Sequence, residues 1–138
     1  NMLKVTRLAD YSVLILCCFD DKKLTAKSIS NITGLGLSTV NKILFLLVKA
    51  NILTPQRGSN GGYLPARKLT EISIKDIVEA IEGPVAITKC SEVENKSCSL
   101  LDSCITKNVW TQVNNSVMKT LQDIKIKDIT INKRSFID

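Results

Sequence analysis

Histidine is absent from the sequence, which removes the side chain that most often serves as a catalytic base. No acid–base pair of carboxylates stands on a recognisable scaffold either, so we expect that the protein is not an enzyme. Long hydrophobic runs are also missing, since no segment approaches the roughly 18 apolar residues of a membrane span. Because the N-terminus lacks the basic, apolar and small-residue regions of a signal sequence, we expect a cytoplasmic location without membrane contact.

The five cysteines include no closely spaced C-x2-4-C pair, and no histidine is present to complete a ligand set, which disfavours structural zinc. Cys17 and Cys18 fall within a predicted helix, where we expect core residues. Cys90, Cys98 and Cys104 instead cluster in and beside a polar segment, with the spacing C-x7-C-x5-C. Iron–sulfur clusters accept such variable spacings and can take a non-cysteine ligand, so a cluster is favoured. Zinc and unliganded redox-active thiols stay open as alternatives.

The positive charge is concentrated in the first half of the chain. Residues 1–70 hold ten basic and three acidic residues, a net charge of +7, whereas residues 71–138 hold nine and ten, a net charge of −1. The basic half is therefore the one expected to meet a polyanion such as DNA. A solvated surface with ordinary excess lysine is the alternative.

The first half also predicts three helices. Thr6 is a plausible N-cap of a helix that ends near Asp20, Thr25 caps a second helix that Gly34 closes, and Ser38 caps a third. Two short helices joined by a turn that contains glycine are typical of a helix-turn-helix. The inward face of the second helix is expected to hold Ala26, Ile29 and Ile32.

The third helix is the one expected to enter the major groove of double-stranded DNA, because helix-turn-helix proteins insert the N-terminal part of their second motif helix there. Small polar and basic side chains at that end are the candidate readers of base edges. They are Ser38, Thr39, Asn41 and Lys42. A solvated helix start is the alternative.

A glycine-rich segment between two short apolar runs, 52–54 and 63–64, predicts a β-hairpin. Since the hairpin directly follows a helix-turn-helix, we interpret it as the wing of a winged helix rather than as a plain hairpin. Its arginine could enter a minor groove or bind phosphate, and its glycines allow close backbone approach. The candidate DNA contacts in the wing are Arg57, Ser59, Asn60 and Gly61.

The second half predicts a fourth helix and a long fifth one. Ser73 and Asp76 form a potential capping box, and Gly83-Pro84 ends that helix, which completes a winged-helix domain over residues 2–84. Residues 85–103 read as a cysteine-bearing loop. Apolar positions then recur every three or four residues in a helix within 104–126, about 30 Å long, which is expected to pair with a copy of itself. Residues 127–138 are expected to form a short apolar return and a loose basic tail. The predicted fold class is mainly α, a winged helix-turn-helix with a small β-hairpin wing and a long C-terminal dimerisation helix.

Several short motifs also occur together in this chain: Leu8-Ala9-Asp10-Tyr11, Leu53-Thr54-Pro55-Gln56-Arg57-Gly58, Gly61-Gly62-Tyr63-Leu64, Ile81-Glu82-Gly83, the three clustered cysteines and Trp110. In this combination, which covers nearly the whole chain, the sequence resembles the winged-helix iron–sulfur regulators that include IscR, NsrR and RirA. The segment 80–90 resembles most the branch that regulates the SUF iron–sulfur assembly operon.

The resemblance implies a homodimer in which each three-cysteine loop lies near the first helix of the partner subunit, with a [2Fe-2S] or [4Fe-4S] cluster controlling DNA binding. IscR-like members complete the cluster with a histidine, where this chain has Lys107. NsrR-like members use a carboxylate at the position that Asp10 matches, so Asp10 is the candidate fourth ligand. A first-turn carboxylate stabilised by the helix dipole is the alternative. Asn41 stands where IscR has a glutamate that discriminates between DNA sites, so a different DNA preference is expected.

The expected function is that of a dimeric transcriptional regulator, a repressor of iron–sulfur assembly or iron-responsive genes, whose DNA affinity depends on cluster occupancy. Two alternatives remain. A cluster-free winged-helix regulator would sense oxidants through its thiols and bind DNA as a colourless protein. An iron–sulfur electron-transfer or carrier protein would show no salt-dependent DNA binding.

Overall fold

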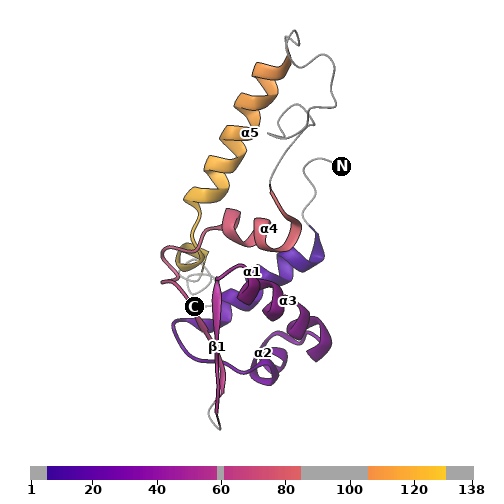
Figure 1. The fold of residues 1–138 in the computed structure, drawn as a ribbon, viewed down its shortest axis with the longest axis vertical. Helices are drawn as coiled ribbons and strands as arrows, with labels where there is room; N and C mark the ends of the chain where they lie inside the picture. Colours follow the sequence, from indigo (N-terminus) through magenta and orange to yellow (C-terminus); the bar gives the residue numbers. More distant parts are fainter. Residues whose placement is uncertain (1–5, 59–60, 85–105, 130–138) are drawn as a thin grey trace, which may run out of the picture.

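The computed structural model describes residues 6–58, 61–84 and 106–129 (Figure 1). Four helices and a hairpin form a compact body, and a longer helix extends from it on the side opposite the hairpin tip. The elements are α1 (Arg7–Phe19), α2 (Ala26–Thr33), α3 (Leu37–Lys49), β1 (Leu53–Gln56), β2 (Gly62–Pro65), α4 (Ile74–Glu82) and α5 (Thr106–Asp123). None of the helices in these ranges combines the length and the apolarity needed to cross a membrane.

Side-chain caps fix where three of the helices begin. The Thr6 hydroxyl accepts the Ala9 amide over 3.3 Å at the start of α1, and the Thr25 hydroxyl accepts the Ser28 amide over 3.0 Å at the start of α2. Ser73 at the start of α4 completes a full capping box with Asp76, as the sequence predicted. Each cap satisfies an amide that would otherwise lack a partner within its helix.

The predicted start of α3 is wrong by two residues. The N-cap is Gly36, not Ser38, and Ser38 lies in the first turn of the helix. Gly36 already has extended backbone angles, and its carbonyl accepts the amide of Val40 over 3.0 Å, so the helix begins at Leu37. The Ser38 hydroxyl therefore has no capping role, and its side chain is exposed.

One hydrophobic core joins the winged-helix elements to the end of the chain beyond α5. Its buried residues are Ile15, Leu16, Phe19, Ile29, Val40, Ile43, Leu44, Leu47, Ile52, Leu53, Leu69, Ile72, Ile77 and Ile126. Ile126 reaches this core because the chain returns after α5: its amide donates to the Ile72 carbonyl over 2.9 Å, and Lys127 Nζ lies 3.3 Å from the Asp20 carboxylate. Each fully buried aliphatic side chain is worth about 1.5–3 kcal/mol.

Two expectations about inward-facing residues need correction, those for Ile32 and Cys18. Ile32 is 59% exposed, because α2 ends at Thr33 and the chain turns away before another described element can cover it. Both cysteines of α1 are half-buried; Cys17 packs against the core as expected, whereas Cys18 is not among the residues packed on it. The core stripe of α1 runs through Ile15, Leu16 and Phe19, so the two cysteines lie at its margins, where Cys18 Sγ donates to the Leu14 carbonyl over 3.3 Å.

The hairpin is a two-stranded antiparallel sheet with a short third partner. β1 pairs with β2 in the register Leu53 to Pro65 and Gln56 to Gly62. On the other side of β2, Tyr63 exchanges two backbone hydrogen bonds with Leu24, of 2.7 and 3.1 Å, in the connection between α1 and α2. The bridge therefore holds β2 against the α1–α2 connection.

Candidate nucleic-acid interface

The outward face of α3 carries three of the four candidate reading residues. Ser38, Asn41 and Lys42 are exposed, whereas Thr39, which was also expected to face outward, is half-buried. The opposite face of the helix is fully buried through Val40, Ile43, Leu44 and Leu47. Since those buried side chains fix the rotation of α3 about its own axis, the exposed residues are held in one orientation.

The turn between α2 and α3 is closed by a local network of hydrogen bonds. Gly34 adopts a left-handed conformation with φ of 79°, and its amide donates to the Ser30 carbonyl over 2.8 Å. The Ser30 hydroxyl donates to the Leu35 carbonyl over 2.6 Å, and the Leu35 amide donates to Thr33 Oγ1 over 3.2 Å. These contacts set the angle between the two helices, as a helix-turn-helix requires.

The hairpin presents Arg57 beside its tip. Arg57 and Gly58 are exposed, and the Gly61 amide donates to the Gly58 carbonyl over 3.0 Å, which closes the turn. Ser59 and Asn60, two further candidate DNA contacts, lie outside the described residues. Gly61 has a structural role in the turn, because a Cβ there would lie only 3.0 Å from the Gly58 carbonyl oxygen.

Gly62 allows the hairpin to approach the α1–α2 connection closely. A Cβ at this position would lie 2.8 Å from the Leu24 carbonyl oxygen, and φ is 153°. The bridge between Leu24 and Tyr63 could not be predicted from the sequence, since a single paired residue shows no alternating pattern. The bridge positions the wing relative to the helix-turn-helix.

The segment that forms the α1–α2 connection, α2, α3 and the wing carries only positive charge. The sequence from Lys22 to Pro65 contains no aspartate or glutamate. Its cations are all exposed, and they lie on the α1–α2 connection, α2, α3 and the wing. They are Lys22, Lys23, Lys27, Lys42, Lys49 and Arg57. Such a surface attracts a polyanion and supplies the phosphate contacts that dominate affinity for nucleic acid.

The candidate metal ligands are only partly within the described structure. Asp10 lies exposed in the first turn of α1, where its backbone amide donates to the Thr6 carbonyl over 3.1 Å. Cys90, Cys98 and Cys104 lie outside the described residues. Within the described ranges, no group of three His, Cys, Asp or Glu side chains is placed to hold a metal ion.

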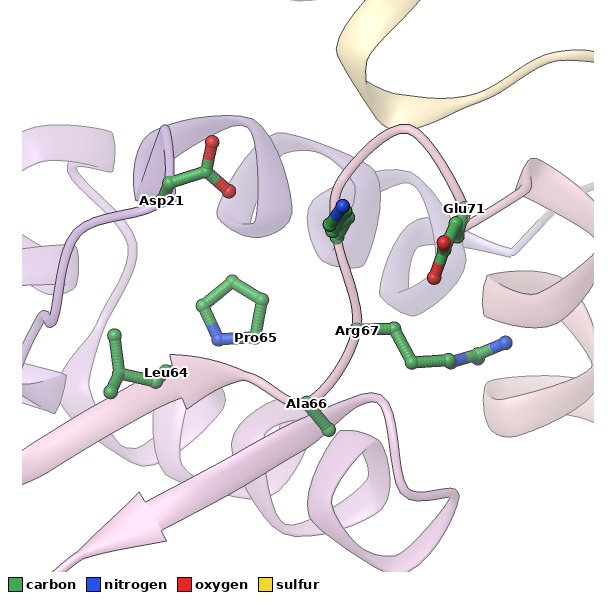
Figure 2. Close-up of a pocket in the computed structure, with 7 residues that line it drawn as sticks. Asp21, Leu64, Pro65, Ala66, Arg67 and Glu71 are labelled. Atoms are coloured by element: carbon green, nitrogen blue, oxygen red, sulfur yellow. The ribbon is translucent and has the colours of Figure 1, made fainter.

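A hollow of about 460 Å³ lies at the foot of the hairpin (Figure 2). Its lining includes the acidic residues Asp21 and Glu71 and the basic residues Arg67 and Lys68, so its charges balance. Arg67 also lies 3.7 Å from the Asp76 carboxylate, which is part of the α4 capping box.

The exposed apolar residues of α5 form a separate surface. Val109 is 53% exposed, Trp110 36% and Val113 38%, and they follow one another at helical spacing in the N-terminal half of α5. The start of α5 extends away from the body (Figure 1). Toward its C-terminal end, α5 comes into contact with α4. Exposed apolar side chains that gather on one face of a helix are typical of interaction surfaces.

Comparison with known proteins gives matches over nearly the whole chain. Residues 4–132 match the Rrf2 family, which is described as an iron-dependent transcriptional regulator. The protein rrf2 of Nitratidesulfovibrio vulgaris is 28% identical over 109 residues, which make up 79% of this chain and 72% of that protein. The solved structure of T. potens IscR superposes with a TM-score of 0.71 at 27% identity, covering 95% of this chain and 88% of that one. The structure of CymR, the global cysteine regulator of B. subtilis, gives 0.70 at 20% identity, covering 95% and 98%, which shows the shared fold alone.

Proposed function

The chain belongs to the Rrf2 family of transcriptional regulators, and on that basis we propose that it is a dimeric DNA-binding regulator whose affinity for its operator is controlled by an iron–sulfur cluster. The family consists of regulators, not enzymes. The DNA-binding part of this proposal rests on one observation. The exposed face of α3 lies beside the wing, and the sequence from Lys22 to Pro65, which forms both, has no acidic residue. The T. potens IscR likeness supports this reading, since that structure shares the winged-helix fold.

In the proposed complex, α3 lies in the major groove. Asn41 offers a side-chain amide that can pair with the edge of an adenine, and Lys42 offers a donor to guanine or phosphate. Arg57 reaches phosphate or a neighbouring minor groove from the wing.

The proposed domain division is a winged helix over residues 2–84, a cysteine-bearing loop over 85–103, a dimerisation helix over 104–126 and a tail over 127–138.

The proposed dimer forms through α5. At about 1.5 Å per residue its 18 residues span roughly 27 Å, and its exposed Val109, Trp110 and Val113 would be covered by the same face of a second copy. A dimer also places two reading helices on a two-fold symmetric operator. A single short helix would bind the operator with little affinity.

The proposed cluster ligands are Cys90, Cys98 and Cys104, with Asp10 from the partner subunit as the fourth. Three thiolates and one carboxylate are a donor set that fits an iron–sulfur cluster, and Asp10 is exposed on α1 with its side chain open to a neighbour. When bound, the cluster would supply a junction between the two subunits that is sensitive to iron supply and oxidation. In the proposed dimer, α1 would position Asp10 as a ligand, and α5 would hold the two winged-helix domains together.

The genes proposed to be under control are those of iron–sulfur assembly or iron response, with the protein acting as a repressor in the cytoplasm. The family description as iron-dependent supports this choice. The fold alone does not decide it, because CymR shares the fold and is described as a cysteine regulator. The proposal of a cluster must therefore be tested against the alternative that the protein is a cluster-free thiol sensor.

The test uses the full chain purified without oxygen and a random library of DNA duplexes. We expect enrichment of a two-fold symmetric sequence, and an affinity for it that falls steeply as salt is raised. Asn41→Ala should weaken specific binding about 10-fold and leave the salt dependence unchanged, whereas Lys42→Ala should also reduce that dependence. Failure to enrich any sequence, or binding that is insensitive to salt, would contradict the proposal and favour a carrier protein.

A further inference from the structure

The recognition helix carries an exposed aromatic side chain that none of the proposed contacts uses. Phe45 is 66% exposed, more than any other large apolar side chain in the described ranges. It lies in the middle of α3, where the buried face is already completed by Ile43, Leu44 and Leu47. An apolar ring in that position is costly to leave in water unless a partner covers it.

Phe45 lies on the same stripe of α3 as the candidate reading residues. It follows Ser38 by seven positions, Asn41 by four and Lys42 by three, and Lys49 follows it by four. With 3.6 residues per turn, these spacings place all five side chains on one face of the helix. The axial rise from Lys42 to Phe45 is about 4.5 Å, slightly more than the step of about 3.4 Å between base pairs.

The major groove offers one apolar group on its base edges, the C5-methyl group of thymine, and phenylalanine is among the side chains suited to contact it. We propose that Phe45 packs on thymine methyl groups in the operator, one or two base pairs beyond those reached by Asn41 and Lys42. This inference deepens the proposed function and rests on it. It adds a position-specific preference for thymine to the polar readout.

The charges around Phe45 favour DNA over a second copy of the chain. Lys42 and Lys49 lie one turn before and one turn after it on the same stripe, and neither α2 nor α3 contains an acidic residue. Pairing two copies through this face would bring like charges together, whereas a phosphate backbone on either side of the groove would neutralise them.

The test compares thymine with deoxyuridine, which lacks only the methyl group. In the sequence enriched from the random library, each thymine is replaced in turn, and affinity is measured for the unaltered chain and for Phe45→Ala. We expect the unaltered chain to lose about four-fold at one or two positions, the equivalent of ~0.8 kcal/mol for each buried methyl group. Phe45→Ala should bind the thymine operator about four-fold more weakly and lose nothing further on substitution at those positions.

Ile32→Ala is the matched control, since Ile32 is similarly exposed at 59% but lies on α2, off the stripe. It should keep the full methyl dependence. If Phe45→Ala shows the same loss with deoxyuridine as the unaltered chain, or if the unaltered chain shows no loss, the inference is overturned while the proposed function stands. A change in the association state of Phe45→Ala in sedimentation would also overturn it, by assigning the ring to a contact between copies. Absence of any enriched sequence would overturn the proposed function itself.

Discussion

The backbone amide of Thr6 donates to the Glu82 carboxylate over 3.1 Å, which ties the residue that caps α1 to the last residue of α4. This contact joins two ends that matter to the proposed cluster. Asp10 lies one turn into α1, and the cysteine-bearing segment follows directly after α4. The contact therefore connects the N-terminal end of α1, the helix that carries Asp10, to the C-terminal end of α4.

The contact is exposed, so its contribution to folding is expected to be small. Glu82→Ala should lower the free energy of unfolding by about 0.5 kcal/mol, since water replaces the lost acceptor. Glu82→Gln keeps an acceptor and removes a negative charge from the C-terminal end of a helix, so it should be at least as stable as the parent chain. Urea denaturation midpoints measure both changes, and equal midpoints for the two variants would show that the hydrogen bond contributes nothing.

The two serines first considered as helix caps should differ in their effect on stability. Ser73→Ala removes a buried hydroxyl that accepts the Asp76 amide, and it should cost about 1 kcal/mol, or roughly 3 °C in the melting temperature. Ser38→Ala replaces an exposed first-turn residue that makes no cap, and it should leave the melting temperature unchanged within about 1 °C. Thermal unfolding followed by circular dichroism tests the pair. An equal loss in both variants would contradict the start of α3 at Leu37.

The tight approach of the wing to the helical body makes Gly62 sensitive to substitution. Gly62→Ala would place a Cβ 2.8 Å from the Leu24 carbonyl oxygen in a backbone conformation that favours glycine, and should cost about 2–3 kcal/mol. Gly36→Ala is the control, because nothing lies within 4 Å of a Cβ there. Denaturant titration compares them. If Gly62→Ala were tolerated as well as Gly36→Ala, the wing would not be held to Leu24 as described.

Local features of the fold could be predicted from the sequence, whereas long-range ones could not. The caps at Thr6, Thr25 and Ser73 depend on residues within one turn of each other, so local spacing identifies them. The exposure of Ile32 and the pairing of Leu24 with Tyr63 depend on where distant segments pack, and no local pattern encodes that.

The residues of the candidate site also differ in how far the sequence alone could predict them. Helical periodicity alone predicted the outward orientation of Asn41 and Lys42, and the structure confirms that both are exposed. The same periodicity places Phe45 on the outward side, and the structure shows that its ring is 66% exposed. The three clustered cysteines lie outside the described residues, so their role stays a prediction.

Removal of the Arg57 guanidinium should weaken DNA binding without changing the sequence preference. A contact with phosphate carries no sequence information, so Arg57→Ala should lower affinity several-fold for all duplexes and reduce the slope of log affinity against log salt by about one. Arg57→Lys keeps the charge and should retain most of that slope. Fluorescence anisotropy over a salt series measures it, and an unchanged affinity at physiological salt would exclude this role for the wing.

The thiolate ligands should be separable from the fold. Cys98→Ala is expected to abolish the visible absorbance of anaerobically purified protein and its iron and sulfide content, with the far-ultraviolet circular dichroism preserved. Cys17→Ala is the matched control and should keep its colour, because Cys17 packs against the core. Full colour in Cys98→Ala would reject the ligand assignment.

The central claim is that cluster occupancy controls operator affinity, and one measurement addresses it directly. The dissociation constant for the enriched operator is measured on a single anaerobic preparation before and after the iron is removed with a chelator, at fixed salt. A coupling of about 1–3 kcal/mol predicts a change of roughly 5- to 150-fold. Equal affinities in the two states, with iron and sulfide shown to be present before treatment and absent after it, would contradict the account.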